Sequence, residues 1–123
     1  MTERLEYLYD SLREIIEEHH PDVASIEELF FNTNITTGIA VGHSRGVILL
    51  ALRKSGVDFY EYTPLQVKQS VVGYGRAEKK QVMIMTKTLL GLERMPRPDD
   101  AADALALAVC HAHCAKSQLL GLM

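Results

Sequence analysis

The sequence predicts an α/β fold, and three features of the chain predict it. Long stretches with apolar residues at helical spacing alternate with two short apolar runs, and residues that favour turns separate them. Because strands that alternate with helices pair in parallel through right-handed crossovers, this order indicates the α/β class. The expected order of elements is αβαβααα. The chain has 123 residues, which leaves room for a single domain over residues 1–123.

The first four elements follow from periodicity and from turn residues. Thr2 is the expected N-cap of a first helix, which ends before Pro21. Residues 23–31, VASIEELFF, predict a buried strand that a pair of glutamates interrupts. An apolar helix is expected over residues 37–54 and a second short strand over residues 57–62.

Three helices are expected in the second half of the chain. The pair Thr63-Pro64 is typical of a helix start, and this helix ends near the glycine turn Gly73–Gly75. A further helix is expected over residues 77–92, and the last one begins at Asp99 or Asp100.

Composition and charge narrow the class of protein. The chain is 47% hydrophobic and 24% charged with a mean hydropathy of -0.01, which is typical of a soluble globular domain. It has neither an apolar run of about 18 to 20 residues nor a basic and apolar leader after Met1, so we expect a cytosolic protein without a membrane span. The net charge of -3 is unevenly distributed, with nine acidic and two basic residues in 1–44 but three and eight in 45–87. The basic middle fits a phosphate-binding surface and fits a solvated face equally well.

Gly38, Gly42 and Gly46 lie four residues apart on one face of the expected helix 37–54. Each glycine costs about 1 kcal/mol of helix propensity relative to alanine, so three on one face indicate the close approach of another backbone. Tight packing within the chain and a dimer interface explain the stripe equally well at this point.

Three carboxylates are candidates for a metal site. Glu27 lies in the apolar strand 23–31, where an unpaired carboxylate would cost several kcal/mol, and a metal ion would remove that cost. Asp100 and Asp103 are three residues apart at a helix start, so they share a face of its first turn. Such acids from separate elements suit a hard cation such as Mg²⁺. The alternative is N-capping by Asp99 or Asp100, with Asp103 favoured by the helix dipole, which is the commoner use of such residues.

Two further patterns resemble a zinc site and a phosphate site, but we favour a structural explanation for each. Cys110, His113 and Cys114 share a helix face that is tolerable for zinc, but no distant cysteine supplies a fourth ligand, and we expect free, buried thiols. The turn Gly73–Gly75 followed by Arg76 has amides and a cation for a phosphate, yet such a turn is usually a connector.

Four runs together resemble one family closely. VASIEELFF, VGHSRGVILLAL, VKQSVVGYGRAEKKQV and DDAADALALAVCHAH, in this order and spacing over about residues 5–113, resemble the RuvC family of bacterial Holliday junction resolvases. The resemblance implies an RNase H-like fold, a homodimer, and an endonuclease that uses Mg²⁺, or Mn²⁺ in its place, to make paired symmetric nicks in four-way junction DNA during recombination and repair. It also implies RuvA and RuvB as partners and a cytoplasmic location.

The resemblance assigns roles to individual residues. Glu27 is similar to the family's strand acid, and Asp100 and Asp103 are similar to its helix acids, so these three are the implied catalytic metal ligands. The residues implied in DNA binding are Phe30, Lys68, Arg76, Lys79 and Lys80. The helix with Gly38, Gly42 and Gly46 resembles the family's dimer helix, which favours the dimer interface for the glycine stripe.

One part of the family's pattern is absent from these residues. The family's fourth acid is an Asp on a first strand, in a segment like I-D-P-G, and this sequence has no such segment. We expect strands to be missing before Met1, because two parallel strands are marginal alone. Loss of a shared carboxylate should reduce the rate by about a thousandfold or more. The alternative function is therefore a catalytically impaired junction-binding or structural dimer.

Overall fold

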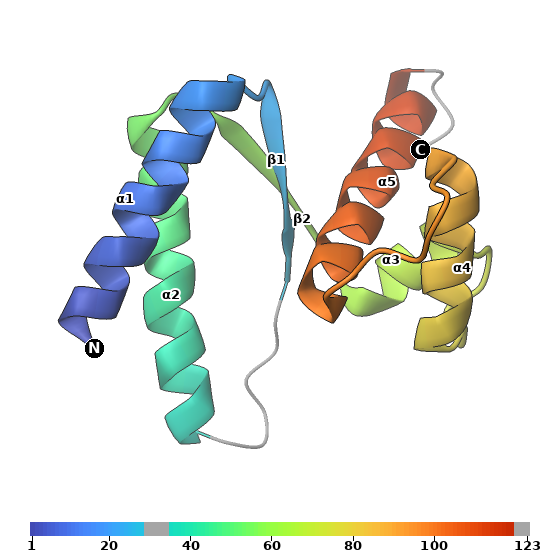
Figure 1. Cartoon of the computed structure of the whole chain (residues 1–123), viewed down its shortest axis with the longest axis horizontal. Coiled ribbons are helices and arrows are strands. Elements are labelled where there is room, and N and C mark those ends of the chain that lie inside the picture. The colour runs from blue at the N-terminus through green and yellow to red at the C-terminus, as the bar shows by residue number, and fades with distance from the viewer. Residues whose placement is uncertain (29–34, 120–123) are drawn as a thin grey trace. The chain divides into compact units, whose positions relative to one another are not determined.

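The computed structural model describes residues 1–28 and 35–119. In these residues the predicted order αβαβααα is confirmed (Figure 1). The elements are α1 (Thr2–His19), β1 (Val23–Glu27), α2 (Ile35–Lys54), β2 (Asp58–Tyr62), α3 (Pro64–Val71), α4 (Lys79–Leu90) and α5 (Asp99–Leu119).

The strands β1 and β2 are hydrogen-bonded neighbours and run parallel (Figure 1). Beyond the end of β1, the amide of Glu28 donates to the carbonyl of Tyr62 at 2.8 Å. The strand ends at Glu27, and residues 29–31 of its predicted range lie outside the described residues. The expectation of a buried strand is wrong: Val23 and Glu27 are exposed and the three residues between them half-buried, since the described sheet has two strands and leaves much of its surface uncovered.

Two expected helix caps also differ from the structure. The N-cap of α1 is Met1, and Thr2 is already helical. At α5 the amides of Ala101 and Ala102 donate to the carbonyl of Pro98 at 3.0 and 3.2 Å. Because the N-cap residue accepts the first intrahelical bond, Pro98 holds the position expected for Asp99 or Asp100.

The chain divides into two compact units. The first comprises Met1–Ala24 and Leu29–Phe59, and in it α1 packs against α2 (Figure 1). The second comprises Ser25–Glu28 and Tyr60–Met123, and in it α3, α4 and α5 pack against one another. The core of the second unit is Val71, Ala106 and Val109, with Val67, Val72, Val82 and Met85 packed against them.

The glycines of α2 have open space beside them. A Cβ atom added at Gly42 or at Gly46 would have no heavy atom within 4 Å in the described structure. Close packing against the described residues therefore does not explain these two glycines.

The connections around α3 agree with the sequence. Thr63 begins α3 through a capping box: its side chain accepts from the amide of Gln66 at 3.1 Å, and its amide donates to the Gln66 side chain at 2.8 Å. After α3, Gly73 has a φ of 108°, and a Cβ at Gly75 would collide with the side chain of Leu65. The turn is thus a tight connector: the φ of Gly73 favours glycine, and a terminal methyl group of the exposed Leu65 packs against Gly75.

Candidate active site

A pocket of about 240 Å³ in the second unit is the candidate site. Its polar wall consists of two carboxylates, Glu27 and Asp103, and two ammonium groups, those of Lys68 and Lys79. These four side chains come from β1, α5, α3 and α4 respectively. The apolar wall is formed by Pro64, Val67, Val82, Ala106 and Leu107.

Local structure holds each element at the pocket. In β1 the hydroxyl of Ser25 donates to the carbonyl of Leu107 at 2.8 Å, which ties the strand segment before Glu27 to α5. The amide of Glu78 donates to the side chain of Gln81 at 2.8 Å, so the helix start that carries Lys79 is fixed. The pocket is therefore built on capped helices and a strand end, which position its side chains better than a loop would.

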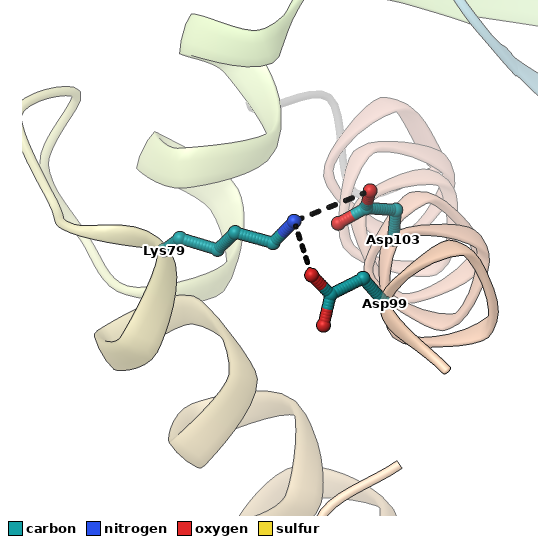
Figure 2. Close-up of polar contacts among 3 residues, drawn as sticks. All are labelled: Lys79, Asp99 and Asp103. Atoms are coloured by element: carbon teal, nitrogen blue, oxygen red, sulfur yellow. Dashed lines mark hydrogen bonds and ion pairs between the residues drawn. The ribbon is translucent and has the colours of Figure 1, made fainter. Parts of the chain in front are cut away.

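Lys79 lies between two carboxylates of α5 (Figure 2). Its Nζ is 3.3 Å from Oδ2 of Asp99 and 3.9 Å from Oδ2 of Asp103. The three side chains are 54%, 71% and 59% exposed, respectively. Solvent screens such pairs, so each contributes about 0–1 kcal/mol to stability.

The structure brings four of the predicted site residues to one pocket and leaves others elsewhere. Glu27, Asp103, Lys68 and Lys79 line the pocket, and Glu27 is exposed, so the predicted burial cost at this carboxylate does not apply. The other predicted residues lie outside this lining: Asp100 borders a second hollow with Lys80 and Asp99, Arg76 is exposed between α3 and α4, and Phe30 lies outside the described residues.

A hard cation suits the donors of this pocket. Mg²⁺ is commonly held by one or two carboxylates, with water and substrate phosphate completing its shell, and Glu27 and Asp103 supply two such carboxylates. The ammonium of Lys79 already places a positive charge beside the α5 carboxylates. Among residues 1–28 and 35–119, however, no three acidic, histidine or cysteine side chains are close enough to hold one ion, so the set Glu27, Asp100 and Asp103 stays a prediction.

Asp99 is a charged neighbour of the site that the sequence analysis treated only as a cap. It lies four residues before Asp103 and therefore on the same helix face. The spacing of four residues was the signal in the sequence that could have placed Asp99 at the site. Asp100 and Asp103 have a similar spacing, so this signal did not distinguish the two pairs.

The cysteines and histidines of α5 have other partners. Both cysteines are free, as predicted, and Cys110 is fully buried with its Sγ 3.8 Å from the carbonyl of Gln66. The expected burial is wrong for Cys114, which is half-buried. Burial, with Cys114 beside it, raises the pKa of the Cys110 thiol to about 11. Nδ1 of His113 is 3.0 Å from the carbonyl of Ser70 and thus turned toward α3.

No helix among the described residues is both long and apolar enough to cross a membrane.

Comparison with known proteins identifies the family. The family model "Crossover junction endodeoxyribonuclease RuvC" matches residues 1–111. The chain belongs to the RuvC family. The RuvC of Ruminiclostridium cellulolyticum is 62% identical over 110 residues, which cover 89% of this chain and 66% of that protein. The RuvC of Alkaliphilus metalliredigens is 61% identical over 118 residues, covering 96% of this chain and 72% of that one.

Solved RuvC structures share the fold. The RuvC structure of Thermus thermophilus has a TM-score of 0.88 and 37% sequence identity, and the match covers 94% of this chain and 70% of that one. The same protein in complex with a Holliday junction substrate has a TM-score of 0.90 over 98% of this chain and 71% of that one. The RNase H-like α/β class is thus confirmed, and the chain spans about two thirds of the length of these relatives.

Proposed function

We propose that this chain is a Holliday junction resolvase of the RuvC type, a Mg²⁺-dependent endodeoxyribonuclease that makes paired symmetric nicks in four-way junction DNA. The observation that supports it is the pocket whose lining contains Glu27, Asp103, Lys68 and Lys79. Carboxylates that suit a divalent cation, beside ammonium groups that suit a phosphate, are the combination that phosphodiester hydrolysis requires.

Each residue has a defined role in this proposal. Glu27 and Asp103, with Asp100, hold the cation, which when bound activates water and stabilises charge on the phosphate. Lys68 and Lys79 hold the backbone phosphate, and Arg76, Lys80 and Phe30 make further contacts with DNA. The glycine face Gly38, Gly42 and Gly46 forms a homodimer, which places two pockets on two like strands. RuvA and RuvB are the proposed protein partners, and the cytoplasm, where bacterial DNA recombines, is the proposed location.

A second candidate is a junction-binding or structural dimer with impaired catalysis. The observation that favours it is the described lining of the pocket, which contains two carboxylates. Two-metal hydrolysis needs carboxylates on both the attacking and the leaving side of the phosphate, and Glu27 and Asp103 are the two that the described lining supplies.

The test uses a synthetic four-way junction with each strand labelled in turn, in Mg²⁺ and in chelator. Paired nicks at symmetric positions, lost in Asp103→Asn while junction binding persists, support the nuclease. Tight, selective junction binding without nicks supports the second candidate. A linear duplex of the same sequence is the control, and equal binding to duplex and junction contradicts both candidates.

A further inference from the structure

Asp99 and Lys79 form a contact that the proposed catalytic roles do not require. The Nζ of Lys79 lies closer to Asp99, at 3.3 Å, than to Asp103, at 3.9 Å (Figure 2). Asp99 is absent from the lining of the candidate site and borders the neighbouring hollow instead. The ammonium of Lys79 is therefore shared between a carboxylate of the site and one outside it.

This contact conflicts with both partners proposed for the site. A divalent cation held by Asp103 would lie beside an ammonium that the same carboxylate contacts, and the two cations would repel. A phosphate held by Lys79 would approach two carboxylates, and these charges would repel as well. Because all three side chains are more than half exposed, their pairing is weak enough to exchange.

Lys68 differs from Lys79 in its contacts with acidic side chains. It is half-buried in the wall of the same pocket, and no ion pair joins it to an acidic side chain in the part of the chain that the structure describes. The two lysines are thus in different electrostatic states before any ligand binds.

We propose that Lys79 is an exchangeable counter-ion that makes metal binding and DNA binding cooperative. Without a divalent cation it neutralises Asp99 and Asp103. A cation at Asp103 displaces it, and the freed ammonium then binds a DNA phosphate, while Asp99 sets how firmly Lys79 is held at rest. This inference rests on the proposed function, because it assumes that Asp103 holds a cation.

The first test measures Mn²⁺ affinity of the full chain without DNA, from the electron paramagnetic resonance signal of the free ion. Lys79→Met should bind Mn²⁺ about three- to tenfold more tightly, because a competing charge beside Asp103 is gone. Lys79→Arg keeps the charge and should bind as the wild type does. Lys87→Met is the matched control, because it removes an equal charge eight residues later in α4, about 12 Å along the helix axis.

A double-mutant cycle tests the role of Asp99. Asp99→Asn should weaken Mn²⁺ binding more in the Lys79→Met background than in the wild type, where the Asp99 charge is already neutralised. Equal effects in the two backgrounds would show that the ion pair does not influence the metal site.

A third measurement addresses cooperativity with DNA and uses a linear duplex, which a structure-selective nuclease leaves intact. Adding Mg²⁺ should steepen the salt dependence of duplex binding more for the wild type than for Lys79→Met, by about one phosphate contact, a slope difference near 0.9. The same slope change in both proteins overturns the proposed exchange.

The outcomes separate this inference from the proposed function. Unchanged or weaker Mn²⁺ binding in Lys79→Met, with junction cleavage retained in the wild type, overturns the exchange alone. Failure of the wild type to bind Mn²⁺ overturns the exchange together with the metal-dependent mechanism. Circular dichroism of each variant confirms that the affinities refer to folded protein.

Discussion

At the scale of single residues, the buried thiol of Cys110 makes the stability of the chain depend on alkaline pH. Burial raises its pKa from 9.0 to about 11 in the folded chain. Between these values the unfolded chain loses the thiol proton and the folded chain keeps it, so the unfolded state binds fewer protons and stability falls as pH rises. We expect a loss of about 1–2 kcal/mol between pH 9 and 11, and none from this group below pH 9.

The measurement is urea unfolding at several pH values for the wild type and for Cys110→Ala. Other groups titrate in this range, so the informative quantity is the difference between the two pH profiles. The profile of Cys110→Ala should be flatter above pH 9 by that amount. Parallel profiles would show that this thiol ionises alike in both states.

Part of the candidate pocket could be predicted from the sequence, and the rest depends on packing that the sequence does not encode. Glu27, Asp103, Lys68 and Lys79 were predicted and line one pocket. The spacing of Asp100 and Asp103 predicts a shared helix face, but it does not say which acid of a first turn points into a pocket. For the same reason, the ion pair of Asp99 with Lys79 depends on how α4 packs against α5, which no local pattern encodes.

At the scale of elements, helices were easier to predict than strand ends. The pair Thr63-Pro64 and the glycine turn Gly73–Gly75 placed α3 correctly, because these signals are local. The predicted strand 23–31 was drawn from a continuous apolar run, whereas β1 ends at Glu27. Burial of β1 depends on what covers the sheet, and sequence alone does not show that.

Replacing a glycine on the open face of α2 should have two opposite effects, one on helix stability and one on dimerisation. Gly42→Ala should raise the intrinsic stability of the helix by about 0.5–1 kcal/mol, because an added Cβ meets no neighbour and alanine favours the helix. The same methyl group should weaken a dimer in which a second helix backbone approaches this face. Thermal unfolding and light scattering over a range of concentrations measure the two effects.

Gly73→Ala is the contrasting variant, because the φ of 108° at Gly73 favours glycine and strains a residue that carries a Cβ. It should lower the melting temperature without changing self-association. If Gly42→Ala leaves the dimer equilibrium unchanged, the glycine face is not the interface, and the stripe needs another explanation.

At the scale of the whole molecule, the expectation of one domain over residues 1–123 has a direct test. The chain passes from the first compact unit to the second within β1 and again within β2. Covalent connections through both strands should make the units unfold together. Hydrogen exchange should therefore give similar opening free energies for the most protected amides of α1 and of α5. A difference of several kcal/mol would indicate two independent folding units.

Self-association is the other property of the whole chain that the structure lets us predict. In the described residues the sheet has the order β1-β2, so each strand is paired on one side. An unpaired strand edge is a template for pairing with another chain, and side chains such as Ile39 and Leu50 of α2 are about half exposed, at 55% and 50%. We therefore expect light scattering to show dimers and larger species for the 123-residue chain rather than a monomer.

The variant Val23→Lys tests whether strand edges cause the larger species. Val23 is the first residue of β1 and is already exposed, so lysine is tolerated there, and a charged edge opposes pairing with another strand. The larger species should decrease while the dimer persists, because the glycine face of α2 is untouched. A loss of both species together would place the strand edge in the dimer itself, and a sharp monomer peak for the unmodified chain would contradict the predicted self-association.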